Sequence, residues 1–449
     1  MDFLWSQPKI IASIIKNSEL DILKKYLAPL FIDNFYDNLF SKYSVENNLI
    51  YLLSLLLKSE IINCPNYDSF LNDTPCSVLF EQLRKKSDIQ NYFKKITEKV
   101  IINLENNYNS IKINFNDKEE LLFTANKKTN EILDANLMYK YLQDPKKEIL
   151  LDYQNKFKDN KIIFDFFDLK IKDFISEPNI YSTEKIRSFL IITYSINIVN
   201  SYYFNFMIVM NFIDEIIQSI FDNISSIPYS LKCFCKIIYI LVRNKFDSSK
   251  SFLAYIFITK FFFGSFLIPY LTNPKKELFM SDLLSKNTLK NLIIICMIFN
   301  RYILADFFKS NKEEEWMYTP FNMYFIQNIP KIFILCDKIK NVELPKFIEL
   351  LINDKLDKNY KYDYFNENEN QIFYYRSIYF YIEQMNVLID TIKNKKSQIA
   401  LTFNDEQNSK EIEIKLDELV AENKFDILKS LNYLEQYNYL LYICFFRSE

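Results

Sequence analysis

The chain has 449 residues, of which 49% are hydrophobic and 17% aromatic, so it can bury a large core in one large domain or up to three ordinary ones. Its single glycine excludes nucleotide-binding loops of the GxxxxGK and GxGxxG kinds, and the absence of histidine excludes Ser-His-Asp catalysis and His-containing zinc sites. We therefore expect no metal, no cofactor and no catalytic site of its own. A net charge of −2 gives no general attraction for nucleic acid, so we also expect no nucleic-acid partner.

The first segment predicts a cytoplasmic, helical protein. MDFLWSQPKI starts with an acidic residue, Asp2, and has no basic stretch before an apolar run, which is unlike a secretory signal. Apolar residues then recur at helical spacing, as in residues 10–15, and the pattern continues in most later segments. The seven widely spaced cysteines are typical of free, buried thiols in a reducing compartment. We therefore expect an all-α fold in the cytoplasm.

Residues 188–213 carry no charge over a length that could span a bilayer. Four asparagines interrupt this stretch, and each amide would need a partner in lipid. A second apolar run, residues 252–271, contains Lys260. Buried helices of a soluble bundle account for both runs better than a multi-span membrane protein, which stays as an alternative. We expect no integral membrane insertion.

Residues 261–274, FFFGSFLIPYLTNP, hold a Pro-x-x-x-Asn-Pro break at the end of a long apolar helix. Because proline cannot donate the helical hydrogen bond, Pro269 and Pro274 are predicted to end or bend this helix and to form a stiff elbow that can hold a partner's loop. A glycine inside a helix costs about 1 kcal/mol relative to alanine, so Gly264 indicates close approach by another backbone. A tightly crossed core helix is the alternative explanation.

Two stretches alternate apolar and polar residues in the manner of β-strands. One is residues 111–115. The other joins Ile399 and Leu401 to the alternating residues 412–416 across a polar stretch, which predicts a small C-terminal β-hairpin. Residues 396–449 would then form an extension with this hairpin and a helix from Glu418 to Tyr442.

Seven segments, including the elbow, follow one another in a recognisable order and spacing. The other six are WSQPKIIASII at 5–15, LDANLMYKYL at 133–142, IPYSLKCFCKIIYILVRNKF at 227–246, LSKNTLKNL at 284–292, YTPFNMYFI at 318–326 and RSIYFYIEQMNVLIDTI at 376–392. Together they resemble the Ras GTPase-activating-protein-related domain of the IQGAP family. The elbow is similar to that family's Tyr/Phe-x-Arg-Tyr/Phe-x-x-Pro-Ala-x-x-x-Pro motif.

The resemblance covers roughly residues 1–395 and implies a large, all-α helical bundle of the Ras GTPase-activating-domain type. It implies a central core at about residues 70–345 and outer helices within residues 1–70 and 346–395, with residues 396–449 as an extension. The implied partner is a small GTPase of the Ras, Rho or Rac type in its GTP form, with cytoskeletal partners beside it.

Such domains are implied to insert an arginine into the active site of the GTPase, where its planar charge neutralises the γ-phosphoryl transition state. LRKKSDIQNYFKKI at 83–96 is similar to the finger segment, which makes Arg84 the candidate finger and Lys85, Lys86 and Ser87 its GTPase-binding neighbours. Only six arginines occur in a chain that otherwise uses lysine, and lysine cannot replace a bidentate guanidinium. The alternative is an ordinary solvated arginine at a helix start.

The implied GTPase-binding groove includes the elbow and the apolar helix after it. Ser265, Pro269 and Asn273 belong to the elbow, and Lys290 and Asn291 are similar to the family's Arg-Asn pair. A plain surface lysine and a polar residue packed against the elbow are the alternatives for these last two.

Three residues of the finger segment and the elbow depart from the family's pattern. Ser265 stands where the motif arginine braces the finger loop, so the finger is expected to be less preorganised. Lys85 stands where a glycine often follows the finger, and a turn with positive φ would be strained there. Tyr270 replaces a small alanine and is expected to crowd the groove.

Three functions follow from these observations. The first is a GTPase-activating module that uses Arg84 to stimulate hydrolysis. The second is a non-catalytic scaffold or effector that holds the GTPase in its GTP form and links it to the cytoskeleton or to cell division. The third is a shared helical architecture without GTPase binding, because a fold alone does not determine function.

Overall fold

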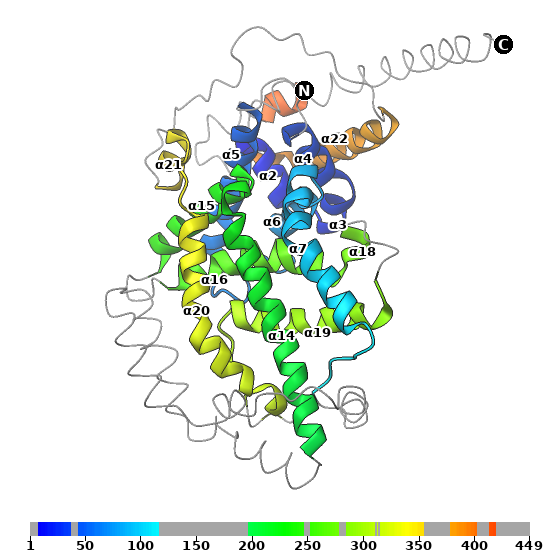
Figure 1. The fold of residues 1–449 in the computed structure, drawn as a ribbon. Coiled ribbons are helices and arrows are strands. Elements are labelled where there is room, and N and C mark those ends of the chain that lie inside the picture. Colours follow the sequence, from blue (N-terminus) through cyan, green and yellow to red (C-terminus); the bar gives the residue numbers. More distant parts are fainter. Residues whose placement is uncertain are drawn as a thin grey trace, which may run out of the picture. The chain divides into compact units, whose positions relative to one another are not determined.

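The computed structural model describes residues 8–36, 44–115, 196–246, 252–277, 284–309, 312, 315–353, 378–401 and 413–418. All regular elements within these ranges are helices (Figure 1). The predicted all-α fold is therefore confirmed. The segment at 133–142 and the helix from Glu418 to Tyr442 lie outside the described residues, apart from Glu418 itself.

The chain divides into two units. The first comprises Met1–Glu60, Asn72–Gln82 and Pro345–Glu449, and the second comprises Ile61–Leu71 and Leu83–Leu344. The division expected from the resemblance, a core at about 70–345 with outer helices on both sides and an extension at 396–449, stays a prediction.

The first unit is built around its N-terminal helices. Ile10, Ile11, Ile14 and Ile15 are all buried, as their helical spacing predicts. The long helix near the C-terminal end packs against them, and the Ser13 hydroxyl donates a hydrogen bond to the Ile399 carbonyl at 3.5 Å. The helices of this unit are α2 (Pro8–Asn17), α3 (Leu20–Ile22), the π-helix η1 (Leu23–Leu27), α4 (Ala28–Tyr36), α5 (Ser44–Asn63), most of α6 (Pro75–Leu83), α21 (Lys346–Ile352) and α22 (Ile378–Leu401).

The second unit holds α14, the longest helix among the described residues, and α19 runs across it in Figure 1. Its closest helix pairs are α7 with α14, α15 with α16, and α17 with α19. Its elements are α7 (Ser87–Tyr108), α14 (Ile196–Asp222), η3 (Ile224–Ser226), α15 (Tyr229–Lys245), α16 (Leu253–Thr259), the π-helix η5 (Lys260–Leu267), α17 (Ile268–Thr272), α18 (Pro274–Glu277), α19 (Lys286–Ile303), η6 (Trp316–Tyr318) and α20 (Pro320–Ile339).

Aromatic side chains fill the core between α7 and the 253–272 helix. Phe93 of α7 stacks on Tyr270 with 5.0 Å between ring centroids and also contacts Phe262 and Phe266. Each such pair adds about 0.5–1.5 kcal/mol beyond area burial. This aromatic cluster fixes α7 against the elbow.

The six described cysteines are buried and free, as expected for core thiols.

The 253–272 run is one continuous helix in three parts, α16, η5 and α17. Proline 269 does not end it, because the five-residue hydrogen bonds of η5, such as the N–H of Ile268 to the carbonyl of Phe263, change the helical register just before the proline. The helix ends at Thr272, and Pro274 begins α18. The elbow is therefore produced at Asn273 rather than at Pro269.

Gly264 does not mark a close backbone approach, contrary to expectation. A Cβ built there would meet only the Cγ of Lys260, at 3.8 Å, which is ordinary van der Waals contact. Its φ is not positive either. Neither space nor backbone conformation therefore requires a glycine at this position.

Residues 111–115 are extended, with Ile111, Ile113 and Phe115 buried, but they form no strand. The predicted C-terminal hairpin is wrong. Ile399 and Leu401 belong to α22, and residues 413–418 are helical. A short alternating run cannot be told from part of a helix by periodicity alone, and here packing of α22 on α2 decided for helix.

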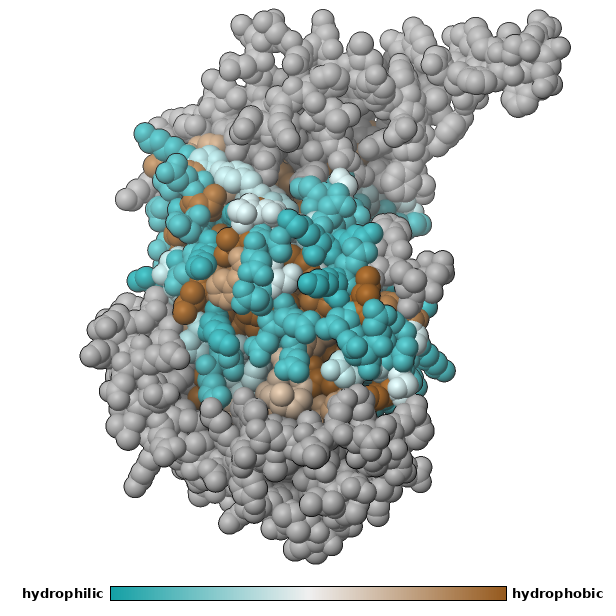
Figure 2. Space-filling model, in the orientation of Figure 1, coloured by the Kyte–Doolittle hydropathy of each residue, from teal (hydrophilic) through white to brown (hydrophobic). Residues whose placement is uncertain are grey.

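Two helical stretches are long and apolar enough to cross a membrane, Phe204–Asp222 and Leu253–Thr272, but 61% and 67% of their apolar windows are buried inside the protein. The ammonium of Lys260, within the second stretch, donates to the carbonyls of Tyr67 and Asp68 at 2.9 and 2.6 Å. On the face shown in Figure 2, hydrophilic residues separate the hydrophobic ones among the described residues. These features are those of core helices.

Candidate functional site

Arg84 follows directly after α6 and is held by Ser265 and Tyr270 of the elbow and by Glu277 of α18, which follows the elbow. Its Nη1 atom donates to the main-chain carbonyl of Ser265 at 3.0 Å, and its Nε atom lies 3.4 Å from the Glu277 carboxylate. The hydroxyl of Tyr270 donates to the main-chain carbonyl of Arg84 itself. We call these four residues the Arg84 socket.

The prolines of the elbow explain why acceptors are available there. In an α-helix the carbonyl of Ser265 would accept from the N–H of residue 269, and Pro269 has none. Arg84 donates to this carbonyl instead. Pro274 starts α18, and the last residue of that single turn is Glu277, which places a carboxylate against the guanidinium.

The pair of Arg84 and Glu277 is shielded from water. Their side chains are only 12% and 9% exposed. Such a buried pair is weakly stabilising overall, but removing one partner leaves an uncompensated charge. The guanidinium in this conformation is thus charge-paired inside the fold rather than extended toward solvent.

Tyr270 does not crowd a groove, contrary to expectation. Its ring is fully buried and stacked on Phe93, and its hydroxyl reaches the Arg84 carbonyl. Burial raises the pKa of Tyr270 above its ordinary value, an effect that the nearby Arg84 charge opposes and Glu277 reinforces. The hydroxyl therefore stays protonated and remains a hydrogen-bond donor across the physiological range.

The residues predicted beside Arg84 differ in exposure. Lys85 and Ser87 are exposed, whereas Lys86 is buried at the residue preceding α7. Lys85 has no positive φ, so the strain expected from a lysine in place of glycine is absent from this turn. Two positions of the segment, 85 and 87, are thus exposed at the surface.

In the elbow, Ser265 and Pro269 are half-buried and Asn273 is exposed. The Asn273 carbonyl accepts from the N–H groups of Lys276 and Glu277 at 3.1 and 3.0 Å. These bonds close the turn that carries Glu277. Of the three predicted elbow residues, the structure therefore brings Ser265 into contact with Arg84, and Asn273 acts through the turn that carries Glu277.

Lys290 and Asn291 lie on α19, where Asn291 binds the residues that follow the C-terminal end of α7. Helix α7 has 22 residues and is about 33 Å long. Asn291 is fully buried, where its amide donates to the Ile111 carbonyl at 2.9 Å and accepts from the Ile113 N–H at 2.8 Å. It pairs with the extended 111–113 backbone as a neighbouring strand would, so it offers no surface for direct contact with a GTPase. The expected packing against the elbow is also not what this side chain does.

The exposed face of α19 is partly apolar. Lys290 is exposed there, followed one turn apart by Ile293 and Met297, which are 57% and 43% exposed. Residues spaced by three or four share a face of a helix. Lys290 therefore lies at one end of an exposed apolar stripe, formed by Ile293 and Met297, which we call the α19 stripe.

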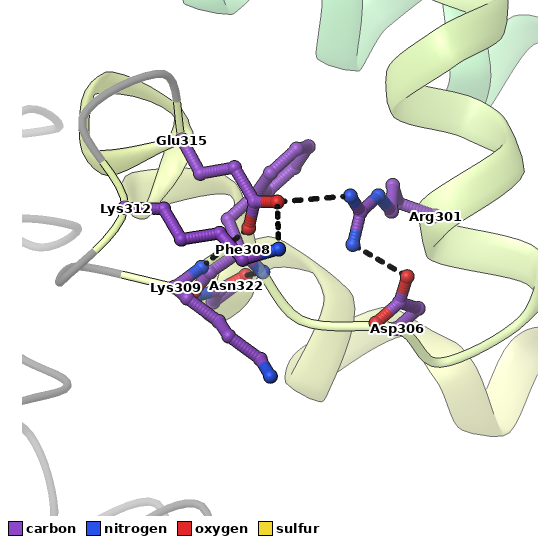
Figure 3. Close-up of polar contacts among 7 residues, drawn as sticks. All are labelled: Arg301, Asp306, Phe308, Lys309, Lys312, Glu315 and Asn322. Carbon is purple, nitrogen blue, oxygen red and sulfur yellow. Dashed lines mark hydrogen bonds and ion pairs between the residues drawn. The ribbon is translucent and has the colours of Figure 1, made fainter.

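Arg301, near the end of α19, is a second arginine that pairs with carboxylates, as Arg84 does (Figure 3). Its guanidinium bridges Asp306 at 2.5 Å and Glu315 at 3.1 Å, and Glu315 also accepts from the N–H of Lys309. Arg243 is exposed and lies over the Tyr239 ring. Among the described arginines, Arg84 and Arg301 thus anchor loops through carboxylates, so arginine scarcity alone does not single out Arg84.

Sequence reasoning missed two residues of the socket, Tyr270 as a bracing donor and Glu277 as the partner of the guanidinium. Glu277 carried one signal, its position in the charged run that directly follows Pro274. Tyr270 was noticed only for its bulk. Both pair with Arg84 across more than 180 positions, which no local pattern encodes.

The sequence was compared with protein families and with curated proteins. The family model described as GTPase-activator protein for Ras-like GTPase matches residues 52–301, a range that includes Arg84, the elbow and α19 up to Arg301. No curated protein matches the chain. The matched range is more than half of the 449 residues. The description of the family indicates the regulation of small GTPases. The chain therefore belongs to the family of GTPase-activator proteins for Ras-like GTPases.

Proposed function

We propose that this protein binds the GTP form of a Ras- or Rho-type small GTPase and stimulates hydrolysis with Arg84. One observation carries the proposal: the family match spans both Arg84 and the elbow, and in the structure these two meet in the socket. The chemistry is that of the GTPase, and the contribution of this chain is a guanidinium placed against the transferring phosphoryl group, worth about 10³–10⁵ in rate.

For this step the guanidinium must exchange its partners. In the free protein it is paired with Glu277 and with the Ser265 carbonyl. A γ-phosphoryl group carries more negative charge than one carboxylate and accepts planar, bidentate hydrogen bonds, so it is the better partner for arginine. The side chain would swing out of the socket as the GTPase docks.

The contacts expected for docking lie on exposed residues. Lys85 and Ser87 follow Arg84, Asn273 lies at the elbow, and Lys290 lies at one end of the α19 stripe. Lys86 and Asn291 are buried, so in this proposal they shape the site from inside. The lysines supply positive charge for a phosphate-bearing partner.

A second candidate function is the non-catalytic scaffold, and the socket itself favours it. An arginine that is 12% exposed and bound on both its Nε and Nη1 atoms can serve as a structural anchor. The protein would then hold the GTPase in its GTP form, as an IQGAP-like effector in the cytoplasm with cytoskeletal partners.

Single-turnover GTP hydrolysis by a panel of Ras-, Rho- and Rac-type GTPases separates the two. Under the first function an excess of this protein accelerates hydrolysis about a thousandfold, and Arg84→Ala abolishes the acceleration while the exposed Arg243→Ala keeps it. Under the second, hydrolysis is unchanged or slower although the GTP form binds. Absence of GTP-dependent binding to any member would overturn both.

A further inference from the structure

We propose that Tyr270 is the positioning residue of Arg84: its hydroxyl fixes the main chain at residue 84 while the arginine side chain is free to leave the socket. The inference rests on the proposed function, because it concerns the same arginine. In the family's motif an arginine at the position of Ser265 braces the finger loop. The inference assigns that bracing role to Tyr270, five positions further along the helix.

The hydrogen bonds of the socket fall into two independent sets. Ser265 and Glu277 bind only the side chain of Arg84, through Nη1 and Nε. Tyr270 binds only its main-chain carbonyl. Withdrawal of the guanidinium would therefore break the first set and leave the second intact, so the loop keeps its position when the side chain moves.

Tyr270 is suited to a fixed position. Its ring is fully buried and stacked on Phe93 of α7, and α17 also packs on α19. A buried tyrosine has few rotamers available, and its hydroxyl lies in the ring plane at a fixed distance from the main chain. The Arg84 carbonyl is thus tied to the core through a rigid arm, in a loop that otherwise joins α6 to α7 with the Lys86 N–H bonded to the Leu83 carbonyl.

The chain offers a matched control in Tyr92. It lies beside Phe93 on α7, is also buried, and among the described residues its hydroxyl has no hydrogen-bond partner. Replacing either tyrosine by phenylalanine removes one hydroxyl and keeps the ring. Only Tyr270→Phe removes the bond to Arg84.

The first measurement needs no GTPase. Limited trypsin digestion of the full chain, with cleavage quantified by mass spectrometry, reports the opening of the loop through its scissile bonds after Arg84, Lys85 and Lys86. We expect initial cleavage there to be about five- to tenfold faster in Tyr270→Phe than in the wild type, and unchanged in Tyr92→Phe, with cleavage after Arg243 as the internal reference. Equal rates in the wild type and Tyr270→Phe would overturn the proposal.

The second measurement separates positioning from general structure. With a GTPase that the wild type stimulates, Tyr270→Phe should lower the maximal stimulated rate about tenfold and leave the half-saturating concentration within twofold, because docking surfaces are unchanged. Loss of docking with an unchanged maximal rate would contradict a positioning role. If no GTPase binds the wild type, the proposed function fails, and the trypsin comparison still decides whether Tyr270 holds the loop.

Discussion

The guanidinium of Arg84 donates a hydrogen bond to the main-chain carbonyl of Ser265, 181 positions further along the chain. The acceptor belongs to a helix in which Pro269 cannot donate to it. An arginine three positions before the start of α7 is thereby joined to the elbow. The stability of the elbow and the position of the candidate finger are thus linked.

Glu277→Gln tests the charge in this link. The substitution keeps the shape of the side chain and leaves the buried guanidinium without its anion, so we expect the free energy of unfolding to fall by about 1–3 kcal/mol. Chemical denaturation measures it. The comparison is Glu81→Gln, which breaks the exposed Lys24–Glu81 pair and should change stability by less than about 1 kcal/mol. Equal effects of the two changes would show that the socket is not charge-paired in solution.

Asn291→Ala removes both hydrogen bonds to the 111–113 backbone and leaves a buried N–H and a buried carbonyl unpaired. We expect a loss of about 2–4 kcal/mol in the free energy of unfolding. Asn287→Ala, which removes one bond from an exposed amide to the Asn109 carbonyl, should cost less than about 1 kcal/mol. If Asn291→Ala were as stable as the wild type but bound the GTPase more weakly, Asn291 would contact the GTPase directly, contrary to what its burial indicates.

The Glu315 carboxylate should make the loop after α19 sensitive to acid. Its burial raises the pKa, but hydrogen bonds from Lys309 and Lys312 and the charge of Arg301 outweigh this and hold the pKa below its usual value. Because the folded-state pKa is depressed, this stabilisation is present above the ordinary pKa near 4.5 and is lost as the pH falls through the folded value. Glu315→Gln should therefore destabilise the protein at pH 7 and differ less from the wild type at pH 3–4, as measured by denaturation at both pH values. A difference that grows on acidification would refute the assignment.

Ile293→Ser tests the α19 stripe as part of the docking surface in the proposed function. Replacing a residue that is 57% exposed should leave the unfolding midpoint unchanged but weaken binding of the GTP-loaded GTPase about fivefold or more. Ile334→Ser on α20, 39% exposed, is the matched change elsewhere in the same unit and should not alter binding. Similar binding by both variants and the wild type would remove the stripe from the interface.

The helical class of the fold could be predicted because apolar spacing repeats in segment after segment, as residues 10–15 and their burial in α2 illustrate. The C-terminal hairpin could not be excluded beforehand. Ile399 and Leu401 alternate over too few residues to distinguish the two periods, and packing against α2 decided between them.

The sequence predicted which segments form the candidate site, but it did not predict which residues of these segments contact one another. Arg84 and the elbow were both identified from their motifs, but their pairing depends on acceptors that sequence does not display, a main-chain carbonyl at Ser265 and a hydroxyl at Tyr270. Asn291 shows the same limit. Its residue type fits a surface groove as well as a buried backbone pair, and only the position of residues 111–113 distinguishes them.

The π-helical turns of η5 have a consequence for how the site can change. A π-helical turn holds about one residue more than an α-helical turn, so η5 accommodates an extra residue with little rotation of the helix that follows. Deleting one residue of η5 ahead of Ser265 is therefore expected to convert it to α-helix and to leave Tyr270 on the face that reaches Arg84. In the α-helical part Leu253–Thr259 each residue turns the helix by about 100°, so a single-codon deletion there is expected to turn Tyr270 away from Arg84 although every member of the socket is still present.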